Sequence, residues 1–307
     1  MKLSIVATLY KSAPYIHEFV DRACKAAEEL VAEDYEIILV NDGSPDDSLE
    51  IAVNLTQENS HLIVVELSRN FGHHKAMMIG LAHAKGGRIF LIDSDLEEEP
   101  EWLIDFSKEM LGQSSDVVYG VQETRKGNLF ERWTGELWYI LFNYLAQIDH
   151  PKNIVTARLM SRNFVQALLL HKESEIVISC LWVITGFKQT SRVVKKNSSS
   201  PSTYSTGKKI NHGVNAITSF STTPLMIIFY IGLLISTFSL FYVVYLVALK
   251  FLRDTTTDGW TSVIASIWLL GGLVILFLGV IGIYLSKVFV ETKKRPLAIV
   301  RKIYGAR

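Results

Sequence analysis

Two long apolar runs without a charged residue constrain this chain more than any other feature. The first covers residues 224–249 and the second covers residues 260–285. A run of about 20 such residues suffices to cross the hydrocarbon core of a bilayer. A pair of buried helices in a soluble domain is the alternative, but uncharged runs of this length are unusual there. We therefore predict transmembrane helices over 224–249 and 260–286, joined by an external linker over 250–259.

The basic residues around these runs predict the direction in which they cross. The linker holds only Lys250 and Arg253, whereas the flank before the first run and the tail after the second are rich in lysine and arginine. Cytoplasmic segments next to membrane helices carry such an excess. We therefore expect a multi-pass protein whose N-terminal domain and both termini are cytoplasmic. A juxtamembrane segment is expected over 211–223 and a basic cytoplasmic tail over 287–307.

Charge and cysteine content argue against two classes of function. The 31 Lys and Arg residues balance 31 Asp and Glu residues, so bulk electrostatics gives no reason to expect a nucleic-acid partner. Two cysteines, Cys24 and Cys180, are too few for a disulfide framework or a cysteine-rich metal site. Each sits among apolar neighbours, which predicts buried free thiols in a reducing compartment.

Residues 1–210 alternate strand-like and helix-like patterns, as is typical of an α/β domain. Apolar segments predict strands over 3–10, 35–42, 62–68, 88–93 and 116–121, and helical spacing predicts helices over 14–31, 46–55 and 75–84. This alternation predicts a mostly parallel, Rossmann-like sheet covered by helices on both faces. Ligands of such sheets bind beyond the carboxyl ends of the strands, where Asp42 and Asp93 are expected.

The stretch FLIDSDLEEEP, residues 90–100, places a row of carboxylates directly after a predicted strand. Asp93 lies at the strand tip and Asp95 two residues further, on the same side of an extended chain. Two such carboxylates repel each other unless a cation lies between them. Mg²⁺ or Mn²⁺ needs only one or two of them when a phosphate supplies further oxygens. In the alternative, the acidic residues cap a helix that begins near Pro100, which explains Glu97–Glu99 better than the two aspartates.

Two further stretches suggest contacts with a phosphorylated ligand. NDGSPDDS, residues 41–48, predicts a tight turn after the second strand, where Asp42 would accept hydrogen bonds from a base or ribose. In SRNFGHHKAMMIG, residues 68–80, Lys75 begins a predicted helix whose N-terminus favours anions. A plain capped turn and a solvated helix entry are the alternatives. The adjacent His73–His74 pair cannot share one helix face and is a poor metal pair.

Four stretches, in this order and spacing, resemble the family 2 glycosyltransferases of the GT-A fold: LSIVATLY, NDGSPDDS, RNFGHHKA and DSDLEEEPEWL. Later parts resemble the polyprenyl-phosphate members of that family, namely GF at 186–187, SFSTTPL at 219–225, the hairpin, and GIYLSKVFVETKKRP at 282–296. That group includes dolichyl-phosphate mannose synthase, the bactoprenol glucosyltransferases and the undecaprenyl-phosphate aminoarabinose transferase. The resemblance implies a GT-A catalytic domain over residues 1–210, followed by a two-helix transmembrane hairpin.

The resemblance also implies an activity, which is the metal-dependent, inverting transfer of a sugar from a nucleotide diphosphate to a polyprenyl phosphate. A UDP-sugar is the favoured donor and undecaprenyl phosphate the expected acceptor. Asp95 and Asp93 would hold Mg²⁺ or Mn²⁺ against the donor pyrophosphate. The implied nucleotide-binding residues are Leu9, Tyr10, Asp42, Ser68, Asn70, Lys75 and Asp93. The implied acceptor-phosphate residues are Arg125, Lys126, Arg158, Lys196, Tyr204 and Lys208.

The same resemblance implies a place in the cell. The protein is expected at the bacterial inner membrane, in contact with the lipid bilayer. Its lipid-linked product would serve the modification of cell-surface glycans such as the O-antigen of lipopolysaccharide. Members of the group are often multimers, so a homo-oligomer is also expected.

One position departs from the family's pattern. The family shows an acidic residue shortly before an Arg-Leu-Met-like segment, whereas NIVTARLMSR, residues 153–162, has Thr156 there, with Arg158 aligned. A threonine cannot act as a carboxylate base, but an acceptor phosphate with a second pKa of about 6 needs little help from one. The candidate catalytic residues are therefore Asp93, Asp95, Arg158 and Thr156. Two alternatives stay open: a family 2 transferase with a saccharide acceptor, and a sugar-nucleotide binding subunit without turnover.

Overall fold

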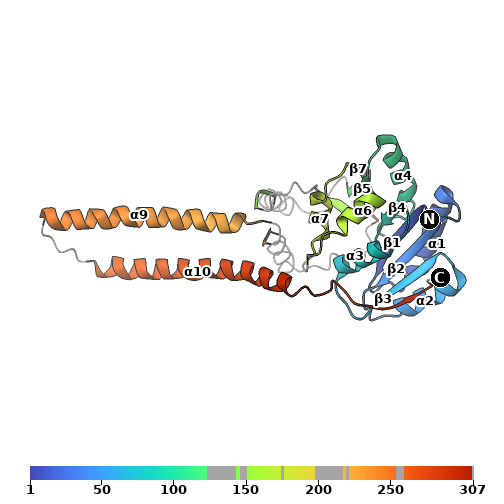
Figure 1. The fold of residues 1–307 in the computed structure, drawn as a ribbon, viewed down its shortest axis with the longest axis horizontal. Helices are drawn as coiled ribbons and strands as arrows, with labels where there is room; N and C mark the ends of the chain where they lie inside the picture. Colours follow the sequence, from blue (N-terminus) through green and yellow to red (C-terminus); the bar gives the residue numbers. More distant parts are fainter. Residues whose placement is uncertain are drawn as a thin grey trace. The chain divides into compact units, whose positions relative to one another are not determined.

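The structure, a computed structural model, describes residues 1–122, 143–145, 151–173, 176–197, 217–218, 221–253 and 259–305. The chain divides into two compact units (Figure 1). The larger unit comprises residues 1–136, 148–204 and 295–307, and the smaller unit comprises residues 137–147 and 205–294.

The larger unit is built on one sheet with the strand order β7-β5-β6-β4-β1-β2-β3-β8 (Figure 1). Its strands are β1 (Leu3–Leu9), β2 (Tyr35–Asn41), β3 (Leu62–Leu67), β4 (Arg88–Leu91), β5 (Val117–Gln122), β6 (Ile154–Ser161), β7 (Gln189–Val194) and β8 (Val300–Tyr304). β1 to β4 pair in parallel, as do β5 and β7, whereas β6 and β8 run antiparallel to their neighbours. The predicted α/β fold is confirmed, but its sheet is mixed because these two strands run in the opposite direction.

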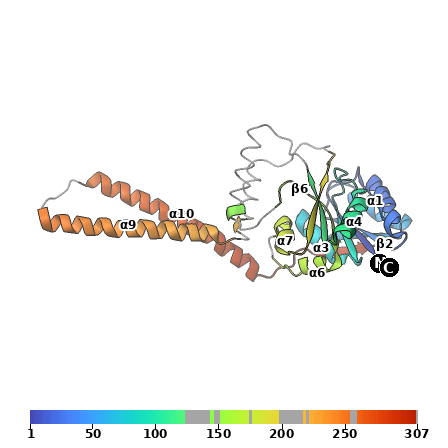
Figure 2. The same cartoon turned by 90° about the horizontal axis from the view of Figure 1, so that it is seen from above.

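Helices cover both faces of this sheet (Figure 2). They are α1 (Ile16–Val31), α2 (Ser48–Glu58), α3 (His73–His83), α4 (Trp102–Gln113), α6 (Arg162–Leu168) and α7 (Ile178–Ile184). Successive strand residues point to opposite faces. Ile5 therefore joins Phe19 of α1 in the main core. A Cβ on Gly80 of α3 would lie 2.4 Å from Val6 and 2.9 Å from Val40, so α3 lies close against the other face.

Two helices show how local sequence sets these elements. In α1 the buried residues Ile16, Phe19, Val20, Ala23 and Ala27 recur every three or four positions, so a single apolar face packs on the sheet. α3 begins at His73, two residues earlier than predicted, so the expected first residue of the helix lies inside its first turn.

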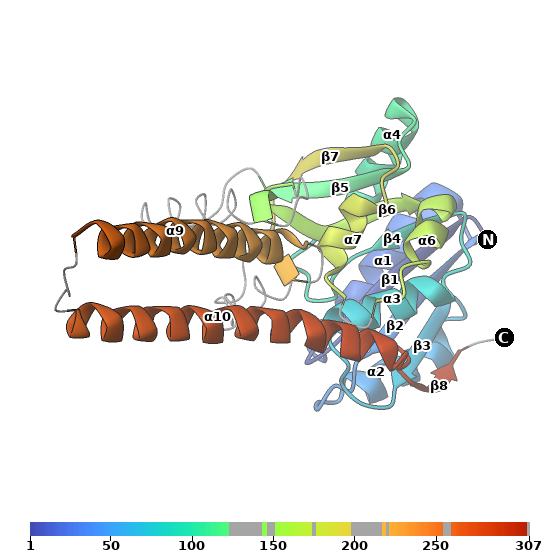
Figure 3. The ribbon, with the colours of Figure 1, turned by 60° about the vertical axis from the view of Figure 1, so that its left-hand side comes forward.

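The last strand comes from the segment that follows the second apolar run. β8 closes the sheet beside β3, as Figure 3 shows. Glu66 of β3 is 6% exposed, and it accepts hydrogen bonds from Tyr304 Oη at 2.8 Å and from Arg301 Nη1 at 3.2 Å. We expected only a basic tail over 287–307. The pairing was missed because a short basic strand has little pattern of its own and its partner acid lies 235 positions away.

The smaller unit contains two long helices, α9 (Thr223–Arg253) and α10 (Trp260–Thr292), which include the two predicted spans. Within the described residues, one segment, Leu270–Thr292, is long and apolar enough to cross a membrane, and Thr223–Ile235 is a shorter apolar stretch. Large apolar side chains of this unit are exposed, for example Leu278 at 62%. Exposed apolar surface of this extent is unfavourable in water.

Candidate functional site

The carboxyl ends of β1, β2 and β4 meet at one edge of the sheet because these strands pair in parallel. Asp42 directly follows β2, and Asp93 follows β4 by two residues. A cavity of about 330 Å³ lies at this edge, and its lining includes His73, Glu98, Thr156, Trp182 and Lys196. The structure thus brings side chains from several strands and loops together here, although Asp42 and Asp93, which the strand pattern predicted for this edge, are not among the described lining residues of the cavity.

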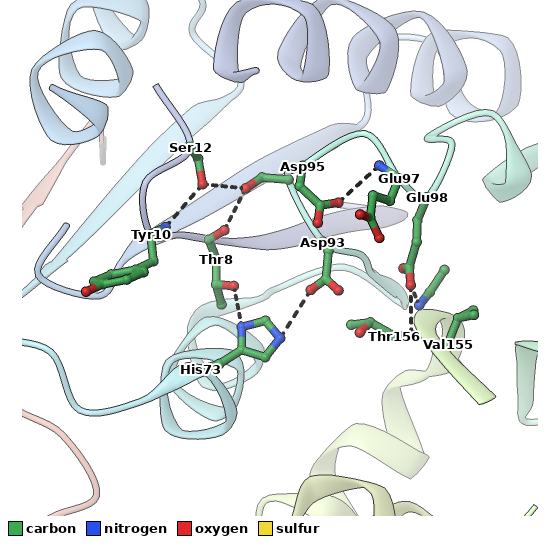
Figure 4. A network of polar contacts seen from close by, with 12 residues as sticks. Thr8, Tyr10, Ser12, His73, Asp93, Asp95, Glu97, Glu98, Val155 and Thr156 are labelled. Carbon is green, nitrogen blue, oxygen red and sulfur yellow. Dashed lines mark hydrogen bonds and ion pairs between the residues drawn. The ribbon is translucent and has the colours of Figure 1, made fainter. Parts of the chain in front are cut away.

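Asp93 lies at the centre of the polar network in Figure 4. Its Oδ1 is 3.2 Å from Nε2 of His73, an ion-pair distance, and its side chain is 19% exposed. The hydroxyl of Thr156 is near enough to this carboxylate to favour its charged form. Burial opposes ionisation of Asp93, but the imidazole of His73 and the hydroxyl of Thr156 outweigh it and lower the pKa of Asp93. The end of β4 therefore presents a charged carboxylate.

Asp95 follows on a turn in which Leu96 adopts a left-handed backbone with φ of 59°. Its Oδ1 accepts the backbone N–H of Glu97 at 3.1 Å, which holds that turn. Burial, together with the charge of Asp93, raises the pKa of Asp95. A divalent cation relieves such a pair of opposed carboxylates.

The residues at this edge fit Mg²⁺ or Mn²⁺ when a bound pyrophosphate supplies further ligand oxygens. Asp93 Oδ1 is buried and makes no aligned hydrogen bond within the described residues, so it is available as a ligand atom. Nowhere in the described ranges do three His, Cys, Asp or Glu side chains group as a metal site by themselves. Asp93 and Asp95 would therefore hold a metal together with oxygens of a bound pyrophosphate.

Glu98 and Lys196 form the opposite side of the network. Glu98 is fully buried and accepts the backbone N–H groups of Thr156 at 3.0 Å and Ala157 at 2.8 Å. Nζ of Lys196 lies 3.0 Å from Glu97 Oε2 and 3.6 Å from Glu98 Oε1. Burial, reinforced by the charge of Asp93, raises the pKa of Glu98 to about 8.

The acidic row, for which a helix cap is the alternative interpretation, has other partners in the structure. In the described structure α4 has no side-chain hydrogen bond at its N-cap, Glu101. Instead, Glu97 and Glu98 bind the segments described above, and Glu99 Oε1 accepts a hydrogen bond from Asn197 Nδ2 at 2.9 Å. The row therefore joins the loop after β4 to β6 and to the residues that follow β7.

The loops after β1, β2 and β3 lie together at the same edge. Asp42 is 2% exposed, and its carboxylate accepts the backbone N–H of Phe71 at 2.7 Å and of Gly72 at 3.0 Å. Its own N–H donates to the carbonyl of Leu9 at 3.1 Å. A Cβ on Gly43 would lie 2.5 Å from the backbone nitrogen of Asn70, so the loops are in direct contact.

The other predicted nucleotide-binding residues differ in their exposure to solvent and in the segments they contact. Tyr10 is 50% exposed, and Asn70 is also exposed. Ser68 donates its backbone N–H to the carbonyl of Ile299 at 2.9 Å, next to β8. Lys75 is partly buried in the first turn of α3.

The predicted acceptor-phosphate residues separate into three groups. Lys196 lines the cavity. Arg158 is 1% exposed, stacks on the ring of Trp182 and donates to the carbonyls of Thr156 and Val155, and it is not among the described lining residues. Arg125, Lys126, Tyr204 and Lys208 lie outside the described residues.

Sequence reasoning missed most residues of this cavity, among them His73, Glu98 and Trp182. His73 was considered only as half of a poor metal pair, Glu98 only as one acid in a row, and Trp182 not at all. A usable signal existed for His73, because it directly follows Gly72 where the chain enters a helix at the ligand-binding edge.

Comparisons with known proteins agree on one family. The profile of the family described as "Glycosyl transferase family 2" matches residues 4–169. A protein of Mycobacterium tuberculosis (strain CDC 1551 / Oshkosh) whose name places it among the glycosyltransferases is 45% identical, over 100% of this chain and 89% of its own length. The glycosyltransferase YkcC of Bacillus subtilis (strain 168) is 35% identical, over 99% of this chain and 95% of its own length. The prophage bactoprenol glucosyl transferase homolog of Escherichia coli (strain K12) is 31% identical, over 99% of both chains.

Proposed function

This chain belongs to glycosyl transferase family 2, and we propose that it transfers a sugar from a nucleotide-diphosphate sugar to a polyprenyl phosphate at the cytoplasmic face of a membrane. One observation supports the choice of a polyprenyl phosphate as the acceptor. The similarity to the Escherichia coli bactoprenol glucosyl transferase homolog extends over 99% of both chains, so it includes the apolar helices as well as the catalytic unit.

The donor would bind at the edge where β1, β2 and β4 end. Asp42 holds the loop that precedes α3 through two backbone hydrogen bonds, so the floor of the nucleotide site is preorganised. Asp93 and Asp95 would hold Mg²⁺ or Mn²⁺ there. When bound, this ion neutralises charge on the departing nucleoside diphosphate.

The acceptor phosphate would enter the cavity beside Lys196, whose ammonium group lies at its wall. A phosphate oxygen attacks the anomeric carbon of the sugar, and the bond from that carbon to the donor's β-phosphate oxygen breaks. The nucleoside diphosphate leaves with the electron pair, and the configuration inverts. Most of the acceptor is already deprotonated near neutral pH, since its second pKa is about 6. Thr156 can therefore occupy this wall without acting as a base.

The position of β8 supports a membrane hairpin. β8 follows α10 in the chain, yet it pairs with β3 of the sheet that precedes α9. The segments before α9 and after α10 must therefore lie on the same side of any membrane, so the intervening chain crosses an even number of times. If the apolar segment of α10, Leu270–Thr292, crosses once, α9 must provide a second crossing.

The decisive experiment is a transfer assay with the full chain in lipid nanodiscs. A panel of radiolabelled UDP-hexoses is incubated with undecaprenyl phosphate and Mn²⁺, and the lipid-linked product is extracted into organic solvent. We expect label in the lipid fraction with at least one donor, and none in excess EDTA. Label on an added oligosaccharide but not on lipid would instead identify a saccharide acceptor. Binding of UDP-sugar without any transfer would identify a non-catalytic subunit.

A further inference from the structure

His73 joins the ends of two strands. It is the first residue of α3, and its ring lies between Thr8 of β1 and Asp93, which follows β4 (Figure 4). Nδ1 is 2.9 Å from the hydroxyl oxygen of Thr8, and Nε2 is 3.2 Å from Oδ1 of Asp93. The ring also lines the cavity, and 47% of the side chain is exposed. Each ring nitrogen therefore faces a different strand, while part of the ring faces the cavity.

The chemistry of the partners assigns the ring hydrogens. A carboxylate accepts hydrogen bonds and donates none, so Nε2 carries a hydrogen toward Asp93. In the neutral ring, Nδ1 then accepts from the hydroxyl of Thr8; in the protonated ring, Nδ1 donates to it. The ring keeps both partners in either state, and a rotation would lose both contacts at once.

The neighbouring histidine has a different role. Nδ1 of His74 lies 3.0 Å from the carbonyl oxygen of Ile176, so this ring connects α3 to the segment before α7. His73, by contrast, contacts Asp93 directly. The hydroxyl of Thr156 approaches the same carboxylate from β6. Asp93 is thus contacted from α3 and from β6.

We propose that His73 is a positioning residue, which Thr8 holds in place and which orients the carboxylate of Asp93 for the nucleotide-sugar donor. This inference rests on the proposed function, because Asp93 is expected to contact the donor or its metal. Correct orientation matters because the carboxylate must face the ligand rather than turn toward solvent. His73 itself need not touch any reacting atom.

A matched pair of variants tests the two polar contacts of the ring, and the two replacement side chains are similar in length and both uncharged. His73→Gln retains an N–H donor for Asp93 and an oxygen for Thr8, whereas His73→Met retains neither. We expect His73→Met to lower kcat/KM for the donor by about tenfold to a hundredfold, the range for a lost polar contact to a charged group. His73→Gln should recover most of that loss. His83→Gln, at the other end of α3, controls for the loss of an imidazole from this helix.

A double-mutant cycle tests the role of Thr8. Thr8→Val should lower kcat/KM in the unchanged protein but have little further effect in His73→Met, because the two residues act as one unit. Additive effects would overturn the inference. Thermal unfolding of each variant shows whether it folds.

The two proposals fail in different ways. Binding of UDP with Mn²⁺ is measured by calorimetry, without an acceptor. If the unchanged protein makes lipid-linked sugar, but His73→Met and His73→Gln match it in both UDP binding and transfer, the inference is overturned and the proposed function stands. If no lipid-linked sugar forms, but UDP binding falls in His73→Met and recovers in His73→Gln, the proposed acceptor is wrong and the positioning role stands.

Discussion

The buried carboxylate of Glu98 accepts the backbone N–H of Thr156 at 3.0 Å, although 58 positions separate the two residues in the chain. This contact joins the loop after β4 to the start of β6. The position at which the chain departs from its family's pattern therefore lies beside a carboxylate from another segment. Its hydroxyl is also a partner of Asp93. The departure at Thr156 is thus placed in an acidic environment, where a further carboxylate would be repelled.

Glu98→Gln should change the pH dependence of stability. The pKa of Glu98 is raised from 4.5 to about 8 in the folded protein, first by burial and then by the charge of Asp93. The folded state therefore holds this proton more tightly than the unfolded state. The stability that this provides is complete below about pH 4.5 and is lost as pH rises toward about 8.

Glutamine does not titrate, so the unfolding temperature of the unchanged protein relative to Glu98→Gln should fall by several degrees between about pH 5 and about pH 8. Differential scanning fluorimetry in excess EDTA measures this. Two curves that stay parallel over the whole range would contradict the prediction.

Asp95→Asn should lower sugar transfer by about a hundredfold or more while leaving the fold intact. The amide oxygen can still accept the backbone N–H of Glu97, which holds the turn. The loss of one of two opposed carboxylates removes a repulsion, so the unfolding temperature should not fall. The readouts are lipid-linked product, Mn²⁺ binding by electron paramagnetic resonance, and thermal unfolding. Full activity of the unchanged protein in excess EDTA would refute the metal role.

Gly43→Ala should raise the KM for the donor at least about tenfold, because it displaces the loop at which we propose that the nucleotide binds. Gly43 has φ of 59°, and a Cβ there would lie 2.5 Å from the backbone nitrogen of Asn70. A backbone atom cannot yield as a flexible side chain can. Steady-state kinetics and thermal unfolding are measured together.

Gly112→Ala is the matched control, since Gly112 lies in α4 with nothing within 4 Å of its added Cβ. It should leave the donor KM unchanged and raise helix stability by up to about 1 kcal/mol. Equal kinetics for the two glycine variants would show that the contact between the loops is unimportant for donor binding.

Tyr304→Phe should lower the unfolding temperature by a few degrees, because the largely buried Glu66 loses a hydrogen-bond donor from β8. In a Glu66→Gln background the same change should matter less, since the charge that Tyr304 satisfies is gone. The unfolding temperatures of the unchanged protein, the two single variants and the double variant form a double-mutant cycle. An unchanged unfolding temperature in Tyr304→Phe would show that this hydrogen bond does not stabilise the sheet.

Local pattern alone predicted several parts of this protein. The two apolar runs became α9 and α10 because length and the absence of charge are properties of one segment. The alternation of β1, α1, β2 and β3 followed from residue spacing, which sets the face that each element buries. The location of Asp93 and Asp95 beyond β4 could be predicted because it depends only on where that one strand ends.

Contacts between distant segments needed the tertiary structure. β6 enters the sheet antiparallel between β4 and β5, and this brings Thr156 to Asp93 and Glu98. β8 returns after α10 to pair with β3, and His73 reaches both Thr8 and Asp93. Each contact joins residues that lie far apart in the chain, so no local periodicity encodes it. These partners meet only because burial of the strands fixes the order in which they lie side by side.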